Sequence, residues 1–301
     1  MTRRVLVLMG GWSSEREVSL VSGAVVVSAL QILGYEAVAA DVPRDMTALL
    51  THFDPRPDVV FNALHGRFGE DGCIQGILNI LGLPYTHSGL MASALAMDKP
   101  MARRLFAQAG IPVASGAVVS RADLLAGDPL PRPYVIKPLN EGSSVGIRII
   151  RDEDGKVPFG EGVWPEGEHV LAEIFVPGRE LTVAVMGDRP LAVTEIVTDH
   201  VFYDYAAKYA AGGSRHLLPA SLPAVVTAEA LRLALLAHLT LGCRGVSRAD
   251  FRFDGRRLVI LEVNTQPGLT PTSLVPEQAA YVGMGFADLV QWMVERAACD
   301  A

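Results

Sequence analysis

Two apolar segments near the end of the chain place the strongest constraint on its fold, because they carry charged and amide side chains. Residues 246–253 (VSRADFRF) and 258–264 (LVILEVN) have the alternation and β-branched content of strands, and Asp254-Gly255 between them favours a turn. The second strand ends in Glu262 and Asn264, whose burial is costly unless a ligand compensates it. The sequence therefore predicts a β-hairpin that carries a binding site.

The length of the turn decides whether Asp250 joins this site. Strand periodicity places Leu258, Ile260, Glu262 and Asn264 on one face. A three-residue turn puts Asp250 opposite Ile260 or Glu262, whereas a two-residue turn puts it on the other face. On the first alternative, three hard oxygen ligands suited to Mg²⁺ converge. The other interpretation is an ordinary hairpin whose charged residues face solvent.

Composition limits the class of protein. The 301 residues, half of them hydrophobic, are enough for two or three small domains with their own cores. A net charge of −7 without a basic stripe argues against a nucleic-acid partner. Cys73, Cys243 and Cys299 lack CxxC spacing and indicate reduced thiols, not disulfides or a zinc site. The apolar run at the start is too short for a signal peptide, and no run has transmembrane length. We expect a soluble cytoplasmic protein with no membrane partner.

The first third of the chain has the pattern of a parallel α/β domain. Val5–Met9 predicts a buried strand, and a glycine turn and Ser14–Glu17, in the form of a capping box, predict a helix after it. A second strand, Val59–Leu64, runs into His65 and a glycine-rich loop. Ligands of such sheets bind beyond the carboxyl ends of the strands, where Glu15 and His65 are expected. Glu15 is equally explained as a favourable acid in a first helical turn.

The middle third contains a candidate phosphate site. Lys137 lies in the apolar strand 134–138 and needs an anionic partner. The loop Gly142–Gly146 is followed by the strand-like segment 147–150, and two strands joined by such a loop can fold over phosphates. The same loop matches GxSxG, the nucleophile motif of serine hydrolases. That motif requires a helix directly after it, which the strand pattern disfavours. No Walker A motif is present.

A long polar segment, Asp199–Arg215, interrupts the last third. A loop of this length in a compact domain is usually a lid or a binding loop. Its aromatic residues have a second explanation, in which they only attach the loop to the surface.

Taken in order, the motifs of the chain resemble the D-alanine–D-alanine ligase family of the ATP-grasp superfamily over nearly its full length. The motifs that carry this resemblance are GGWSSEREVS at 10–19, HGRFGEDG at 65–72, MDK at 97–99, IKP at 136–138 with EGSSVG at 141–146, FYDY at 202–205, KY at 208–209, and LEVN at 261–264 with PG at 267–268.

The resemblance implies an α/β (α+β) chain in which an N-terminal parallel-sheet domain precedes an ATP-grasp fold of two α+β subdomains. The expected ranges are 1–90 for the substrate domain, 91–180 for the central subdomain and 181–301 for the C-terminal catalytic subdomain. The implied reaction joins two D-alanine molecules for peptidoglycan synthesis, using ATP, through D-alanyl phosphate. A D-alanine–D-lactate ligase is the alternative. The family's habit also implies a homodimer.

The resemblance further implies the role of each site residue. The expected ATP-binding residues are Lys99, Lys137, Ser143, Ser144 and Lys208 around the phosphates, Glu173, Phe175 and Val176 around adenine, and Glu180 at the ribose. Two Mg²⁺ (or Mn²⁺) ions are expected on Asp250, Glu262 and Asn264. Glu15 is expected to bind the ammonium group of the first D-alanine, and Lys208 and Ser273 the carboxylate of the second. His65 and Leu274 are expected as further substrate-binding residues. The expected catalytic residues are Glu15, Ser143 and Tyr209, with Arg248 and the Gly268 N–H for the oxyanion.

Tyr209 bears on the choice of acceptor. By resemblance, ligases that form the ester lack a tyrosine at this position, so its presence favours an amine acceptor. We expect Tyr209 to meet Ser143 and Glu15 when the lid closes, forming one hydrogen-bonded set. The alternative is that Tyr209 only packs the loop.

Overall fold

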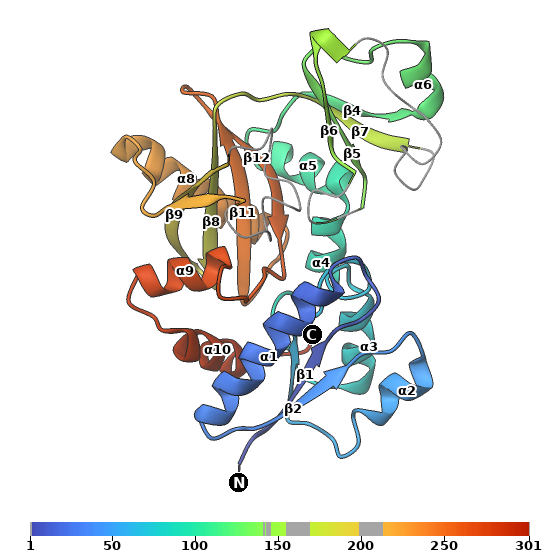
Figure 1. Ribbon diagram of the computed structural model, residues 1–301, viewed down its shortest axis with the longest axis vertical. Helices are drawn as coiled ribbons and strands as arrows, with labels where there is room; N and C mark the ends of the chain where they lie inside the picture. The colour runs from blue at the N-terminus through green and yellow to red at the C-terminus, as the bar shows by residue number, and fades with distance from the viewer. Residues whose placement is uncertain (1, 141, 143–145, 155–168, 199–212, 301) are drawn as a thin grey trace.

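The computed structural model describes residues 2–140, 142, 146–154, 169–198 and 213–300. The described residues form three β-sheets with helices between and around them (Figure 1). The parallel sheet and a four-stranded sheet lie at opposite ends of the long axis, with α4 (Leu90–Met97) and α5 (Lys99–Gln108) between them. This mixture of one parallel and two antiparallel sheets confirms the predicted fold class.

The N-terminal sheet has the order β2-β1-β3 with all strands parallel, as predicted. Its strands are β1 (Arg4–Met9), β2 (Glu36–Asp41) and β3 (Val59–Asn62), and the helices that accompany it in sequence are α1 (Arg16–Ile32), α2 (Met46–Thr51) and α3 (Cys73–Leu81). The central strands of such a parallel sheet are apolar because both of their faces are buried. One face packs with α2 and α3, and the other with α1.

The predicted capping box at the start of α1 is absent. The N-cap residue is Glu15, and its side chain makes no capping hydrogen bond. Ser13 takes part in the turn instead, because its hydroxyl accepts from the Glu15 N–H (3.2 Å) and donates to the His65 carbonyl (2.6 Å). The turn before α1 is therefore fastened to the loop after β3, which brings two predicted site residues together.

The central part of the chain forms a four-stranded antiparallel sheet of order β4-β7-β5-β6. Its elements are β4 (Gly116–Ser120), α6 (Arg121–Ala126), β5 (Tyr134–Pro138), β6 (Arg148–Ile150), η1 (Asp152–Asp154) and β7 (His169–Ile174). Asp98 separates α4 from α5 and caps the latter by accepting from the Met101 N–H (2.9 Å).

The C-terminal part forms a five-stranded antiparallel sheet of order β10-β9-β8-β11-β12. Its elements are β8 (Arg179–Met186), β9 (Arg189–Val197), β10 (Arg215–Leu217), α8 (Ala224–Thr240), β11 (Val246–Phe253), β12 (Leu258–Asn264), α9 (Leu274–Tyr281) and α10 (Phe286–Glu295). One face packs against α8 and α5 in the largest hydrophobic core. None of the helices described here is both long and apolar enough to cross a membrane.

The last helices also complete the N-terminal domain. Leu289, Val290 and Met293 of α10 share one hydrophobic core with Val5 and Phe61 of the parallel sheet. The division at residues 90 and 180 remains a prediction, since this core joins the first and third ranges.

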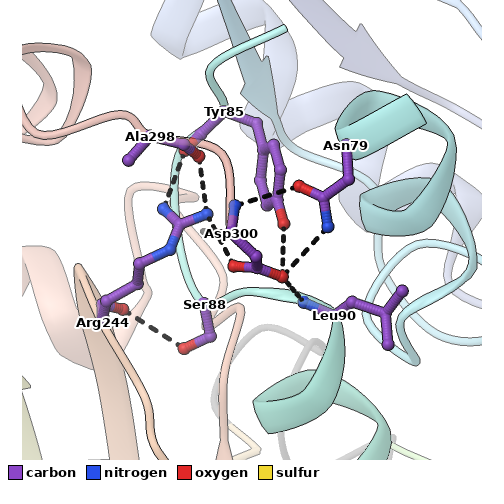
Figure 2. Close-up of polar contacts among 7 residues, drawn as sticks. All are labelled: Asn79, Tyr85, Ser88, Leu90, Arg244, Ala298 and Asp300. Carbon is purple, nitrogen blue, oxygen red and sulfur yellow. Dashed lines mark hydrogen bonds and ion pairs between the residues drawn. The ribbon is translucent and has the colours of Figure 1, made fainter. Parts of the chain in front are cut away.

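The C-terminal tail extends this connection beyond α10 (Figure 2). Ala298 forms a two-way backbone bridge with Tyr85 (3.2 and 3.3 Å), and Arg244 donates to both of their carbonyls at 2.7 and 3.1 Å. Asp300 then reaches the start of α4. Its carboxylate accepts from the Leu90 N–H (2.7 Å) and the Asn79 amide (3.0 Å).

Asp300 acts as a helix cap supplied from a distant part of the sequence. The N-cap residue of α4 is Gly89, which has no side chain to satisfy the first N–H groups. A Cβ atom at Gly89 would lie 1.9 Å from an Asp300 oxygen, so glycine is required there for the carboxylate to approach. Burial raises the pKa of Asp300, but the hydrogen bonds from Leu90 and Asn79 outweigh this effect and hold the pKa below its usual value.

Candidate active site

The hairpin of β11 and β12 has a longer turn than expected. Phe253 pairs with Leu258, so residues 254–257 form a four-residue turn where a two- or three-residue turn was predicted. The Asp254 carboxylate closes this turn by accepting from the backbone N–H groups of its last two residues, at 2.8 and 2.9 Å. A regular ladder from this turn would place Asp250 opposite Leu261 and away from the predicted metal ligands.

A β-bulge restores the pairing. The register shifts between Asp250 and Phe251, so that Phe251 faces Ile260 while Asp250 faces Glu262, and Leu261 is the inserted residue. The predicted position of Asp250 opposite Glu262 is therefore confirmed. It depends on the bulge and not on the turn.

The bulge also corrects the predicted face of β12. Leu258 and Ile260 do not share a face with Glu262 and Asn264, because the inserted residue reverses the alternation. The two apolar residues pack with Phe251 in the core under α8, whereas Glu262 and Asn264 line a cavity on the other side of the sheet. One strand thus serves both the core and the site.

Arg248 and Asp250 bind each other on the cavity side of β11. The Arg248 Nε and Nη2 atoms donate to the two Asp250 oxygens at 2.9 and 2.7 Å, and the Thr182 hydroxyl on β8 donates to the same carboxylate at 2.6 Å. The Arg248 and Asp250 side chains are 12% and 11% exposed. A two-point pair of this kind is strong and directional. Arg248 therefore orients the carboxylate beside it.

The oxygen donors fit a divalent cation. Asp250, Glu262 and Asn264 offer two carboxylates and one amide oxygen, the hard donors that Mg²⁺ prefers. Burial, together with the charges of Glu15 and Glu262, raises the pKa of Glu70 well above its usual value. No group of three His, Cys, Asp or Glu side chains arranged for a metal occurs in the described parts of the chain. The proposed donor set is not a group of that kind, because its third member is the amide of Asn264.

Gln266, which the sequence did not single out, ties β12 to the N-terminal domain. Its N–H donates to Asn264 Oδ1 (2.8 Å) and its side-chain oxygen accepts from the Asn62 amide (2.7 Å). Its side-chain nitrogen donates to the Leu64 carbonyl. Gln266 is 1% exposed. Its position two residues after Asn264 is the sequence feature from which its role could have been inferred. The end of β12 is thereby held against the end of β3.

Three buried titratable residues form the N-terminal wall of the cavity. Glu15, His65 and Glu70 are each less than a tenth exposed. Burial lowers the pKa of His65 to about 4, so its ring is neutral at pH 7, and Ser22 lies 3.4 Å from its Nε2. Glu70 was missed, although it belongs to the polar loop that was recognised; two adjacent acids, Glu70 and Asp71, in a glycine-rich loop were its signal.

The two lysines of the predicted phosphate site are buried. Lys99 begins α5 and is 7% exposed, and Lys137 is 6% exposed. The anionic partner expected for Lys137 is Glu173, which also pairs with Arg103. Burial lowers the pKa of Lys137 to about 7, while the Glu262 charge opposes that change. The Glu173 carboxylate thus lies between two cations.

The other predicted nucleotide residues lie where the two antiparallel sheets are connected. Phe175 and Val176 follow β7, and Glu180 is the second residue of β8. Arg252 of β11, which was not predicted, binds this segment through Glu180 and the Val176 carbonyl. Arg252 lies two residues after Asp250 and four residues after Arg248, so the alternation of side chains along a strand could have placed it on their face.

The segment after β12 closes the cavity on its last side. Gly268 lies so near Ser273 that a Cβ atom would be 2.9 Å from the serine hydroxyl. That hydroxyl accepts from the Thr270 N–H at 2.9 Å, and Leu274 begins α9 and is buried.

One cavity, partly open to solvent, joins these walls. It lies between the parallel sheet, α4 and the hairpin. The predicted residues that line it are Glu15, His65, Lys99, Arg248, Glu262, Asn264, Gly268, Ser273 and Leu274, and Glu70, Thr270 and Thr272 are among the additional ones. Residues far apart in the sequence therefore meet at one place, as predicted for a substrate site.

Four predicted residues, Ser143, Ser144, Lys208 and Tyr209, lie outside the described residues, as does most of the expected lid. The serine hydrolase alternative is nevertheless excluded. The element after the GxSxG sequence is the strand β6, paired with β5, and not the helix that a nucleophile elbow requires.

Comparison with known proteins identifies relatives over the whole chain. The family model for the D-ala D-ala ligase C-terminus matches residues 105–295, and that for the N-terminus matches residues 47–88. A D-alanine–D-alanine ligase of Paramagnetospirillum magneticum is 62% identical, with both chains covered completely. One from Rhodospirillum rubrum is 61% identical over the same share of each chain.

Solved structures give the same result. A crystal structure of D-alanine–D-alanine ligase from Bacillus anthracis complexed with ATP matches with a TM-score of 0.83 and 29% identity, covering 98% of this chain and 96% of that one. A second structure of the Bacillus anthracis ligase matches with a TM-score of 0.85 and 31% identity, covering 98% and 97%.

Proposed function

This chain belongs to the D-alanine–D-alanine ligase family, and we propose that its active site is the cavity between the β11–β12 hairpin and the N-terminal sheet. The enzyme uses ATP to join two D-alanine molecules into D-alanyl-D-alanine, a component of peptidoglycan precursors. The reaction passes through D-alanyl phosphate, whose carbonyl carbon is attacked by the amine of the second D-alanine, with release of phosphate.

A single observation carries the assignment of the site. The bulge in β12 turns Glu262 and Asn264 toward the side of the sheet that Arg248 and Asp250 occupy, and Glu15 lies in the wall of the same cavity. Catalysis between two substrates and a nucleotide requires several charged groups around one enclosed space. This arrangement supplies them from distant parts of the chain.

For the first D-alanine, we propose that Glu15 binds the ammonium group. A buried carboxylate at the cavity wall attracts a cation strongly, because little water screens the pair. Glu70 lies in the same wall, and its raised pKa favours its neutral form. Neutral His65 then offers a hydrogen bond without repelling the ammonium group.

For ATP, we propose that Lys99 and Lys137 bind the phosphates and that Phe175, Val176 and Glu180 bind adenosine. The ion pair of Lys137 with Glu173 supports the view that Glu173 holds the lysine in place until a phosphate arrives. Burial lowers the pKa of Lys137 to about 7, and the charge of a bound phosphate would raise this pKa again and favour the charged lysine.

Asp250, Glu262 and Asn264 would hold Mg²⁺ or Mn²⁺. When bound, such ions neutralise the oxygens of the phosphoryl group during its transfer. Thr182 and Arg248 keep the Asp250 carboxylate in one orientation, and the Gln266 N–H does the same for the Asn264 oxygen.

For the second step, we propose that Arg248 and the Gly268 N–H stabilise the tetrahedral oxyanion. Arg248 lines the cavity beside Glu262, and Gly268 lies on the opposite side near Ser273. The start of α9, at Ser273 and Leu274, suits the carboxylate of the second D-alanine, because helix N-termini favour anions.

Release of ADP and phosphate tests this function directly. We expect release that requires both Mg²⁺ and D-alanine, with L-alanine inactive. Replacing part of the D-alanine with D-lactate should produce dipeptide and no ester. ADP release that is independent of D-alanine would contradict the proposed use of the cavity, and ester as the main product would favour the D-lactate alternative.

We also propose that the protein is a homodimer. Ile80 of α3 and Met91 of α4 are 88% and 66% exposed, which supports an apolar contact that involves these two helices. Light scattering should give twice the chain mass, and Ile80→Glu should give the monomer. A monomeric wild-type protein at micromolar concentration would contradict this proposal.

A further inference from the structure

The connection between β7 and β8 is bound to the five-stranded sheet by one guanidinium group. The Arg252 Nε donates to the Val176 carbonyl (3.1 Å), its Nη2 to the Gly178 carbonyl (2.9 Å) and its Nη1 to Glu180 Oε2 (3.2 Å). Arg252 and Glu180 also face each other directly in the β11–β8 register. Both the backbone and the carboxylate of this segment are therefore held by the same side chain.

Two further contacts restrict the segment. The Arg252 guanidinium carbon lies 5.6 Å from the centre of the Phe175 ring, within the range of a cation–π interaction. Gly178 has φ +101°, and a Cβ atom there would be 2.2 Å from the Phe253 carbonyl oxygen. The segment therefore packs closely against the end of β11, and its contacts with Arg252 and Phe253 restrict its position relative to the sheet.

The chemistry of Arg252 suits positioning more than general stabilisation. Its side chain is 17% exposed and that of Glu180 is 16% exposed, so the pair is largely shielded from water. Arg252 donates from three separate nitrogens of one planar group, whereas the three N–H donors of a lysine share a single nitrogen and cannot reach all three acceptors. A carboxylate can accept several hydrogen bonds at once, so the contact of Glu180 with Arg252 is compatible with acceptance from hydroxyl groups.

We propose that Arg252 is a positioning residue that sets the recognition of ribose, a role that rests on the proposed nucleotide site. The ligand is a purine ribonucleoside triphosphate, whose 2′- and 3′-hydroxyl groups donate to Glu180. Arg252 holds the Glu180 carboxylate where the ribose binds, and it holds Phe175 and Val176 beside the base. A site built to bind a hydroxyl discriminates against the analogue that lacks it only while its acceptor is held in place.

The test compares ATP with 2′-deoxy-ATP in wild type and Arg252→Met, using D-alanine-dependent phosphate release. The quantity compared is the ratio of kcat/KM for ATP to kcat/KM for 2′-deoxy-ATP. We expect this ratio to fall about tenfold in the variant, which is the effect of one lost hydrogen bond to a charged group. The KM for ATP should rise about tenfold while kcat stays within about twofold, because the groups at the reacting atoms are unchanged. Glu180→Gln should lower the same ratio.

Two further variants make the result specific. Arg257→Met removes an arginine of the same hairpin that is 66% exposed, and it should leave the ratio unchanged. Arg252→Lys keeps the charge without the fork, and its ratio should fall as in Arg252→Met; this variant also serves if the methionine variant does not fold. If Arg252→Lys or Arg252→Met keeps the wild-type ratio, the inference is overturned. A wild-type ratio near one overturns it as well, because the protein would then not discriminate between the two nucleotides. Wild-type protein without D-alanine-dependent release would instead refute the proposed function.

Discussion

Replacing Arg248 with methionine should affect stability and catalysis separately, because the residue has two partners in the proposed mechanism. In the folded protein it supplies two hydrogen bonds to the buried carboxylate of Asp250. In the reaction it would face the tetrahedral oxyanion. Arg248→Met keeps most of the side-chain volume and removes both interactions.

The expected loss of stability follows from the contacts. Removing one partner of a buried ion pair typically costs about 3–5 kcal/mol. Thr182 still donates to Asp250 at 2.6 Å, so we expect the lower end, about 3 kcal/mol. In Arg248→Met/Asp250→Asn the carboxylate is gone as well, and about half of the lost free energy of unfolding should return. The rate of the ligase reaction should fall about 10²–10³-fold in the single variant and should not recover in the double variant.

The assays are urea denaturation followed by circular dichroism and phosphate release at saturating ATP. Mg²⁺ provides a control, because a cation held by Asp250 should partly replace the missing guanidinium and raise the urea midpoint of Arg248→Met more than that of the double variant. Equal midpoints for the single and double variants, with or without Mg²⁺, would refute the view that Arg248 compensates the Asp250 charge. A variant defective only in ATP affinity would show that Arg248 has a different role.

Three other changes test separate parts of the structure. Glu262→Gln should raise the Mg²⁺ concentration for half-maximal phosphate release about 10–100-fold, because a ligand is weakened without a cavity being created, and an unchanged Mg²⁺ dependence would contradict the metal assignment. Asp300→Asn should lower the free energy of unfolding by about 0.3–1 kcal/mol, because the amide can still accept from the start of α4 but lacks the negative charge that a helix N-terminus favours. Since the folded pKa of Asp300 is lowered, the wild-type advantage should be complete above about pH 4 and disappear as the pH falls further, and a difference that persists in acid would argue against the carboxylate. His238 is 1% exposed, binds Ser247 at 2.7 Å, and has a pKa lowered to about 4 mainly by burial, so unfolded chains take up a proton first as the pH falls below about 6.5. The free energy of unfolding of wild type should therefore fall between about pH 6.5 and about pH 4, and the decline should be shallower in His238→Asn; parallel curves would mean that His238 is not responsible.

The sequence predicted the chemistry of the site better than its backbone. An acid and an amide at the end of an apolar strand were enough to identify Glu262 and Asn264, because buried polar groups are rare without a ligand. The bulge at Leu261 was not predictable, since it is an irregularity that lets one strand serve two faces. Strict alternation consequently assigned Leu258 and Ile260 to the wrong side.

Contacts between distant segments were also beyond prediction. Lys137 was correctly expected to need an anion, but the sequence did not indicate Glu173 as its partner or Arg103 as a second cation. Gln266 bonds to a carbonyl 202 residues away, and no local pattern encodes such a partner. The predicted capping box failed for the same reason, because Ser13 binds a carbonyl in a different loop. Local propensity is overridden where tertiary contacts satisfy the same groups.

The cap that Asp300 provides for α4 has a consequence for synthesis of the chain. A ribosome finishes the N-terminal sheet early, and domains generally begin to fold in that order. The Tyr85 bridge and the start of α4, however, receive their partners from residues 298 and 300, which are made much later than residues 79–90. We therefore expect the region around residues 79–90 to reach its final form only after residues 298–300 have left the ribosome. Nascent chains truncated before residue 298 should accordingly remain open to a protease at this region.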